Sequence, residues 1–173
     1  DQVIQSIEPC LVPKHSQLGS VEGVFNAVLV EGDFVGAGLS VGRGAGEGPT
    51  ASAIVADIID LARGLNVPTF GKPVRELTTP QWADAGETTN RYYIRLNVTD
   101  RAGVVAEITA ILRDFNISIE AFLQRGRDPD QPVPLVMTTH ETRHGDMMKA
   151  MKEIEKIEAM VQKPCIMRIE ELE

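Results

Sequence analysis

The sequence predicts an α+β protein with two units joined by a linker. Residues 1–68 combine strand-like apolar runs with one amphipathic helix, and residues 91–173 alternate strand and helix patterns over a longer stretch. Residues 69–90 between them are rich in Pro, Gly and Thr and have no sustained hydrophobic period. Since each flanking stretch has a pattern of its own, we predict domains over residues 1–68 and 91–173, with 69–90 as the linker.

The composition is typical of a folded protein whose partners are small molecules or other proteins. The chain has 173 residues, 43% of them hydrophobic, and a formal net charge of −8 with a pI of about 4.9. Sequence-independent binding to nucleic acid or to an anionic membrane needs clustered Lys and Arg, so the acidic balance argues against both. No stretch approaches about 18 consecutive apolar residues, so no membrane span is predicted. The chain begins Asp-Gln-Val-Ile without an initiator Met, and we expect it to be part of a longer cytoplasmic protein.

The cysteines and histidines do not follow a metal-ligand pattern. Cys10 and Cys165 are about 155 residues apart, with no second Cys or His at ligand spacing beside either, so we predict two reduced, buried thiols. His140 and His144 are four residues apart, but one follows a strand-like run and the other precedes a helix, so they need not share a face. No metal site is predicted.

The first unit is predicted to contain three strands and one helix. Residues 2–12, 24–30 and 34–41 are rich in Val, Ile and Leu, and the last two are joined by a Gly-bearing hairpin connection. A helix is expected over 49–63, because Pro is tolerated in a first turn and Gly64 is placed to stop the helix. These elements leave one face of the sheet or of the helix without cover, so they form only part of a domain.

The second unit is predicted to have the element order βαββαβ. Strands are expected over residues 92–98, 117–124, 133–140 and 165–169, and helices over 102–115 and over a stretch striped by Met147, Met151, Ile154 and Ile157. This order is the ferredoxin-like plan, in which two helices cover one face of a four-stranded antiparallel sheet.

A glycine tract lies directly before the helix of the first unit. Residues 42–48 read Gly-Arg-Gly-Ala-Gly-Glu-Gly. Glycines permit close backbone approaches, and a helix N-terminus offers unpaired N–H groups to an anion. The tract is therefore a candidate for contact with a nucleotide cofactor, with a simple strand-to-helix turn as the alternative. The chain lacks a strand followed by G-x-G-x-x-G and a later acidic residue, so a complete nucleotide-binding domain is not predicted.

Short motifs frame the first helix of the second unit. Residues 97–100 read Asn-Val-Thr-Asp at the end of a strand, 101–105 read Arg-Ala-Gly-Val-Val at the start of the helix, and 116–119 read Asn-Ile-Ser-Ile before the next strand. In the βαββαβ frame these motifs resemble the ACT domain, a small-molecule-sensing module attached to many amino-acid metabolic enzymes. The resemblance covers about residues 91–171.

The ACT resemblance implies an effector site at three residues of this unit. Asp100, Gly103 and Asn116 occupy places where related domains bind an amino acid, usually between two domains paired side by side. Asp and Asn can satisfy an ammonium group and hydrogen-bond donors. Capping of the helix by Asp100 is an equal alternative. Val98 stands where some ACT domains have a histidine, so the ligand contacts need not transfer in detail.

Three segments of the first unit carry a second resemblance. Residues 12–14 read Val-Pro-Lys, 21–28 read Val-Glu-Gly-Val-Phe-Asn-Ala-Val, and 44–53 read Gly-Ala-Gly-Glu-Gly-Pro-Thr-Ala-Ser-Ala. With an ACT domain downstream, they resemble the last part of the catalytic region of homoserine dehydrogenase in its long bacterial form. The two resemblances together cover nearly the whole chain.

This second resemblance implies which residues approach a cofactor. The family transfers a hydride between NAD or NADP and the aspartate semialdehyde/homoserine pair, in threonine and methionine biosynthesis, with a Rossmann domain and a catalytic lysine that lie upstream of this chain's segments. Gly44 and Gly46 would touch the cofactor from the far side of its site. Thr50 is a candidate to hydrogen-bond the cofactor or the substrate, with a role as helix cap as the equal alternative. No residue of this chain is expected to be catalytic, and Lys14 is expected on a solvated turn.

Two hypotheses follow for the chain. The first is the C-terminal, regulatory part of an NAD(P)-dependent homoserine dehydrogenase, inactive alone, that forms a homodimer or higher homo-oligomer. Its ACT domain would sense an amino acid, with threonine as the expected effector, and exert allosteric control. The alternative is a non-enzymatic amino-acid-binding module in which residues 1–68 serve as a dimerisation segment.

Overall fold

The computed structural model describes residues 2–65, 70–124 and 132–171. The chain divides into two compact units. The larger unit comprises residues 2–12 and 81–171, and the smaller unit comprises residues 13–80.

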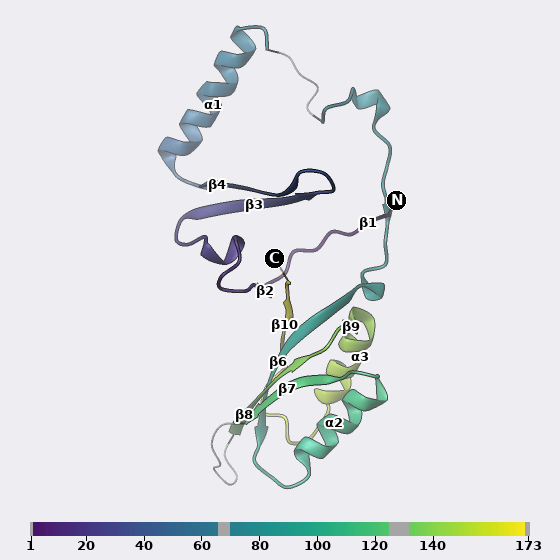
Figure 1. The fold of residues 1–173 in the computed structure, drawn as a ribbon. Helices are drawn as coiled ribbons and strands as arrows, with labels where there is room; N and C mark the ends of the chain where they lie inside the picture. The colour runs from purple at the N-terminus through teal and green to yellow at the C-terminus, as the bar shows by residue number, and fades with distance from the viewer. Residues whose placement is uncertain (1, 66–69, 125–131, 172–173) are drawn as a thin grey trace. The chain divides into compact units, whose positions relative to one another are not determined.

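The larger unit contains the predicted βαββαβ series (Figure 1). Its elements are β6 (Thr89–Thr99), α2 (Val104–Asp114), β7 (Ile119–Gln124), β8 (Pro132–Thr139), α3 (His144–Ile154) and β10 (Cys165–Ile169). The four strands are antiparallel in the order β10-β6-β8-β7, and a two-residue strand β9 (Thr142–Arg143) pairs with the beginning of β6. This arrangement confirms the α+β class and the ferredoxin-like plan.

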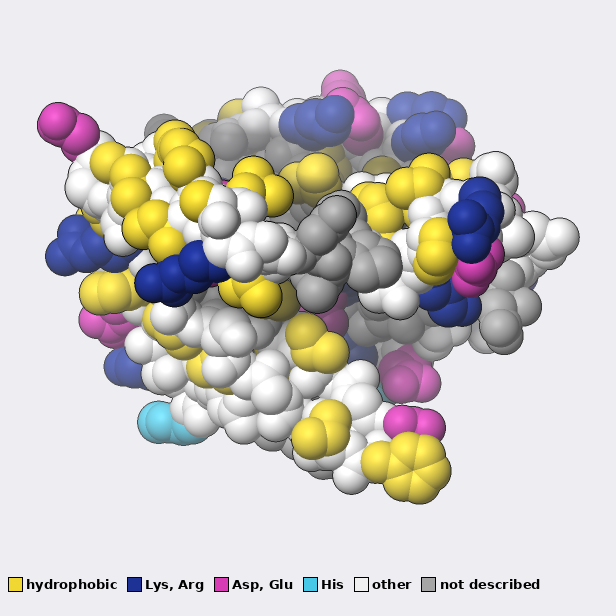
Figure 2. Space-filling view, turned by 90° about the horizontal axis from the view of Figure 1, so that it is seen from above, with side chains coloured by type: hydrophobic (Ala, Val, Ile, Leu, Met, Phe, Trp, Pro, Cys, Tyr) yellow, Lys and Arg dark blue, Asp and Glu magenta, His cyan; other side chains and the backbone are white. Residues whose placement is uncertain are grey.

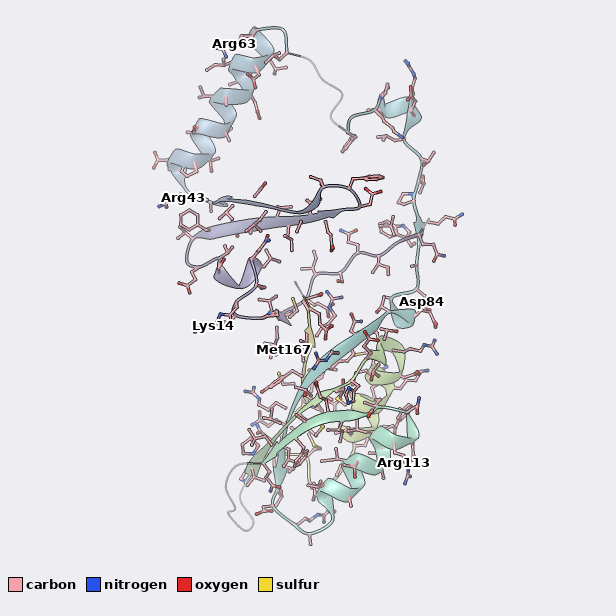
Figure 3. The ribbon with its side chains drawn as sticks, viewed as in Figure 1. Lys14, Arg43, Arg63, Asp84, Arg113 and Met167 are labelled. Carbon is pink, nitrogen blue, oxygen red and sulfur yellow. The ribbon has the colours of Figure 1, made fainter. Side chains whose placement is uncertain are left out.

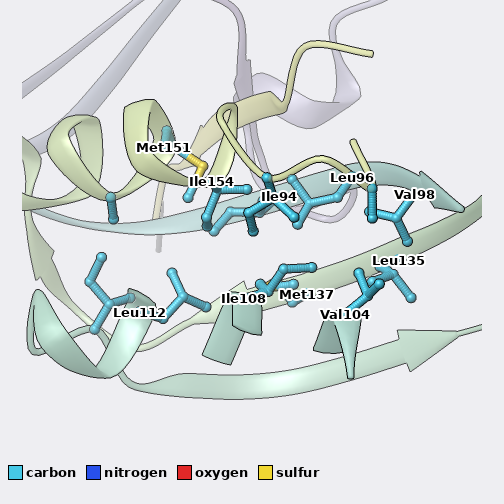
Figure 4. Close-up of a cluster of buried hydrophobic side chains, with 14 of the residues drawn as sticks. Ile94, Leu96, Val98, Val104, Ile108, Leu112, Leu135, Met137, Met151 and Ile154 are labelled. Carbon is cyan, nitrogen blue, oxygen red and sulfur yellow. The ribbon is translucent and has the colours of Figure 1, made fainter. Parts of the chain in front are cut away.

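The core of the larger unit lies between the sheet and its two helices (Figure 4). Side chains alternate along β6, so every second residue from Tyr92 to Val98 is buried. Helix α2 contributes Val104, Ile108 and Leu112, which are spaced by four residues and therefore share one face. Helix α3 contributes Met147, Ala150, Met151 and Ile154. The buried methionines confirm that this stripe is core.

The prediction of one continuous strand over residues 2–12 was wrong. The segment forms two short strands, β1 (Gln2–Val3), which pairs in parallel with β5 (Gln81–Trp82), and β2 (Cys10–Leu11), which pairs in parallel with β10. Pro9 precedes β2 and has no N–H for a strand ladder. Both strand pairs of this segment lie within the larger unit, while the functional domain boundary at residue 68 stays a prediction.

The smaller unit consists of a hairpin, a helix and short turns. Strands β3 (Phe25–Gly32) and β4 (Gly36–Arg43) form a two-stranded antiparallel sheet, and α1 spans Glu47–Ala62. Short 3-10 helices span Leu18–Ser20 and Val74–Glu76, and a third, Ala85–Glu87, lies in the larger unit.

The apolar stripe of α1 is exposed, as the sequence predicted for a partial domain. Ile54, Val55, Ile58 and Ile59 are 42–58% exposed, and hydrophobic side chains stand at the surface viewed in Figure 2. Among the described residues of the smaller unit, only Ser16 is buried. This unit therefore has no apolar core of its own in its described part.

No helix in the described part of the chain has the length and apolarity that a membrane crossing requires. Within the same residues no three His, Cys, Asp or Glu side chains gather as metal ligands would. The prediction of two buried thiols was wrong, because Cys10 is exposed and Cys165 is only partly buried. Cys10 lies on β2, at the edge of the sheet, where a strand has a neighbour on one side only.

Candidate functional site

The glycine tract forms the connection from β4 to α1. Gly46 is the N-cap residue of α1, and its φ of 128° and ψ of 148° are accessible almost only to glycine. Its carbonyl oxygen accepts the first helical hydrogen bond, from the N–H of Thr50 at 3.1 Å. The helix therefore begins in a turn of defined shape that requires glycine at this position.

Glycine at position 44 is favoured for a different reason, which is packing. A Cβ atom at Gly44 would lie 1.4 Å from Nδ2 of Asn26, whose backbone lies on β3. A side chain at position 44 would therefore require the Asn26 side chain to move. Asn26 belongs to one of the motifs that carried the family resemblance, so two of those motifs meet in space.

Thr50 lies in the first turn of α1, past the cap position. Gly46 occupies the N-cap and offers no side chain, so the interpretation of Thr50 as the helix cap was wrong. Glu47 places a carboxylate in the same turn, where the positive end of the helix dipole stabilises it. Lys14 lies on an exposed turn, as predicted (Figure 3).

Asp100 and Gly103 lie in the connection from β6 to α2. Gly103, and not Asp100, is the N-cap residue of α2, and it adopts a left-handed conformation with φ of 96°. Helix capping by Asp100 is therefore not observed. The Oδ2 atom of Asp100 is buried and has no hydrogen-bond partner among the described residues. A buried acceptor without a partner is unfavourable, which makes this carboxylate a candidate for a ligand contact. The space beside Gly103 is open, since an added Cβ atom would meet no atom within 4 Å.

Asn116 ends α2 in a left-handed conformation, with φ of 57°. Its N–H donates to the carbonyl oxygen of Arg113 and that of Ile117 donates to Leu112, both at 2.8 Å. Asn is one of the few residues other than Gly that tolerates this conformation. Asn116 therefore has a structural role at this helix end that its sequence motif did not predict.

The three predicted effector residues do not meet within one chain. Gly103 and Asn116 flank opposite ends of α2, whose 11 residues span about 16 Å at the usual helical rise. A free amino acid is much shorter than this distance. A site that uses both Asp100 and Asn116 would therefore need a second copy of the chain.

Two family models match the chain, one in each predicted domain. Residues 2–59 match the homoserine dehydrogenase family, and residues 92–159 match the ACT domain. Relatives named homoserine dehydrogenase share this order over nearly the whole chain. The one from Neisseria gonorrhoeae is 38% identical over 96% of this chain and 40% of its own length, and the one from Helicobacter pylori is 35% identical over 95% and 38%.

Solved structures of homoserine dehydrogenases also match nearly the whole chain. A crystal structure of a homoserine dehydrogenase from Thiobacillus denitrificans is 36% identical and has a TM-score of 0.79, over 95% of this chain and 38% of its own. The S. aureus enzyme at pH 6.0 is 21% identical, with a TM-score of 0.54 over 96% of this chain and 38% of its own, and supports the fold alone. The chain spans about two fifths of the length of the relatives it matches. It therefore belongs to the homoserine dehydrogenase family, whose C-terminal part it matches, and it carries an ACT domain.

Proposed function

We propose that the chain is the part of an NAD(P)-dependent homoserine dehydrogenase that completes the cofactor site and carries the regulatory domain. The complete enzyme would interconvert homoserine and aspartate semialdehyde in threonine and methionine biosynthesis. The observation that carries this proposal is the match to proteins of that name over 95–96% of the chain. The chain alone would be inactive, since its sequence contains no Rossmann glycine motif.

The turn from β4 to α1 is the part that would contact the cofactor, NAD or NADP. Its shape fits a close backbone approach, because the observed position of the Asn26 side chain leaves no space for a Cβ atom at Gly44, and Gly46 requires a glycine conformation. The cofactor supplies and accepts the hydride, while Gly44, Gly46 and Thr50 would bind and orient it. Because Glu47 is negative, we expect backbone N–H groups and the Thr50 hydroxyl to hold uncharged parts of the cofactor.

The cofactor contact is testable in a longer protein that carries this chain as its C-terminal part. Thr50→Val removes one hydroxyl at nearly constant volume, whereas Thr50→Ser keeps it. If the hydroxyl binds the cofactor, Thr50→Val should raise the KM for NADPH about 5- to 20-fold and Thr50→Ser should change it much less. An equal KM in Thr50→Val and the unchanged enzyme would remove Thr50 from the site.

The ACT domain would bind the effector, with threonine expected, at Asp100 and Gly103. The Oδ2 atom of Asp100, which has no partner among the described residues, suits an ammonium group, and the open space beside Gly103 admits a ligand. Since Asn116 lies at the far end of α2, its side chain would enter the same site from a second copy of the chain. This geometry favours a homodimer or higher homo-oligomer as the binding state.

A second copy has an available edge in the larger unit. Strand β7 is the last strand of the sheet, and its Phe122 and Leu123 are 42% and 47% exposed. If this edge paired with the same edge of a second copy, both side chains would become less exposed and the unpaired backbone N–H and C=O groups of β7 would gain hydrogen-bond partners. Sedimentation should show a dimer at micromolar concentration, and a monomer in the presence of saturating threonine would contradict the shared site.

A further inference from the structure

The larger unit contains a cavity of about 150 Å³ that the proposed function does not use. One wall comes from the N-terminal segment, with Ile4, Ile7 and Glu8. The other comes from the sheet and α3, with Asn90, His144 and Arg168. The first wall lies in the homoserine dehydrogenase match and His144 lies in the ACT match, so the cavity is built from both family regions.

Hydrogen bonds fix two of the polar side chains of this cavity. Nδ1 of His144 lies 2.9 Å from the hydroxyl of Tyr92, which is 2% exposed. Nδ2 of Asn90 donates to Oγ1 of Thr88 at 3.1 Å and to the Tyr92 hydroxyl at 3.4 Å. Burial raises the pKa of Tyr92, so the phenol keeps its proton. The Tyr92 hydroxyl therefore joins the side chains of Asn90 and His144 in one hydrogen-bond network.

The cavity is also lined by one negative and one positive side chain, Glu8 and Arg168, which form an ion pair. Nη1 of Arg168 lies 3.5 Å from Oε1 of Glu8, and Nη2 of the same guanidinium bonds Glu170. The Nε atom of Arg168 is buried and has no hydrogen-bond partner among the residues the structure describes. The guanidinium therefore has donor capacity that its present partners do not use.

These charges match a ligand that carries both signs. A carboxylate would pair with Arg168 and an ammonium with Glu8, while Ile4 and Ile7 would contact an apolar group. A simple anion in the cavity would face the carboxylate of Glu8, and a simple cation would face Arg168. A volume of about 150 Å³ admits a small molecule.

We propose that this cavity binds a small zwitterion, that is, a free α-amino acid with a short side chain. The site is separate from the effector site at the start of α2. Asn90 lies near the beginning of β6 and Asp100 follows its end, so ten residues of extended strand, about 33 Å, lie between them. A ligand here would bridge the N-terminal segment and the ACT sheet.

The probe for this site is L-alanine, with acetate and methylamine as its two single-charge halves. In a two-dimensional NMR titration of the whole chain, L-alanine should shift the side-chain amide of Asn90 and the Nε–H of Arg168. Acetate and methylamine should need at least about tenfold higher concentration for the same shifts. Acetate binding as tightly as L-alanine, or no shift of these two signals, would overturn the proposal.

Two matched variants test whether the carboxylate that lines the cavity binds the ligand. Glu8→Gln removes the charge proposed to hold the ammonium and should weaken L-alanine about tenfold. Glu170→Gln removes a carboxylate from the same guanidinium outside the cavity lining and should change binding less than about threefold. Equal effects of both variants would contradict the assignment of Glu8.

The Asp100→Asn variant distinguishes this site from the effector site. It should leave the L-alanine shifts at Asn90 unchanged, because the two places lie at opposite ends of β6. If the Asn90 shifts disappear in Asp100→Asn, the proposed second site is wrong. If they persist while threonine never binds at Asp100, only the proposed effector function is wrong.

Discussion

The larger and smaller units differ in how much apolar surface they bury, although the sequence of each unit has a clear periodic pattern of hydrophobic residues. In the larger unit the stripes of β6, α2 and α3 face one another and form a core in which Ile94, Leu112 and Ile154 are at most 1% exposed. In the smaller unit the stripe of α1 remains 42–58% exposed at its Ile and Val residues. The same kind of pattern gives a core only where its partner surface is present in the chain.

The largest expected effect is a difference in stability loss between two isoleucine substitutions, one in each unit. Ile94→Ala removes a side chain that is 0% exposed and should destabilise the larger unit by about 2–5 kcal/mol, because it leaves a cavity. Ile58→Ala, at 58% exposure, should change stability by less than about 0.5 kcal/mol. Urea unfolding followed by circular dichroism measures both. Similar losses in the two variants would mean that α1 is covered in solution.

The turn that begins α1 offers a second contrast, inside the smaller unit. Gly46→Ala forces a side chain into a conformation with φ of 128° and should cost about 1–3 kcal/mol. Gly48→Ala, in the same turn, meets open space at an ordinary φ and should be neutral or stabilise the helix by up to about 1 kcal/mol. Hydrogen exchange of the Thr50 amide reports both changes. Faster exchange in Gly48→Ala than in Gly46→Ala would contradict the observed turn.

Asn116 tests whether a residue of the larger unit acts through its backbone or its side chain. Asn116→Gly keeps the left-handed helix end and should change stability by only a few tenths of a kcal/mol, whereas Asn116→Ala should cost about 1–2 kcal/mol. If the side chain also contacts the effector, both variants should weaken threonine binding equally. Thermal unfolding and calorimetry together separate the two roles.

The smallest effect concerns an exposed ion pair on the sheet of the larger unit. The hydrogen bond from Arg91 holds the pKa of Glu120 below its usual value, with a second contribution from Thr138. Since the folded-state pKa is lowered, the contribution to stability is present above the unfolded-state pKa and is lost as the pH falls through the folded-state pKa. Arg91→Met should therefore raise the pKa of Glu120 in a carbon-13 carboxyl titration. An unchanged pKa would show that the pair does not form in solution.

The sequence predicts most of the larger unit because its periodic residues all point to one core. Each pattern is local and predicts one element type with one buried face. Apolar residues alternate from Tyr92 to Val98, as in a strand, and Val104, Ile108 and Leu112 are spaced by four, as in a helix. The N-terminal segment was not predicted correctly, because its parallel partners β5 and β10 are about 80 and 160 residues away and Pro9 breaks its local pattern.

The candidate sites were less predictable than the fold. Gly44, Gly46, Asp100 and Gly103 all lie at strand-to-helix connections, as their motifs indicated, but their cap roles depend on backbone angles that residue types do not determine. The polar cavity could not be predicted, since Glu8, Asn90, His144 and Arg168 are scattered through the chain and share no spacing. The pairing of β2 with β10, of β10 with β6 and of β9 with β6 brings these regions together.

Titration calorimetry with threonine tests the central claim, that the ACT domain keeps an amino-acid-sensing site in this chain. We predict saturable heat with the unchanged chain at concentrations where it is dimeric. Asp100→Asn should lower the affinity by about tenfold or more, because the ammonium loses its charged partner. Absence of heat with the folded dimer, or equal affinity in Asp100→Asn, would contradict the account.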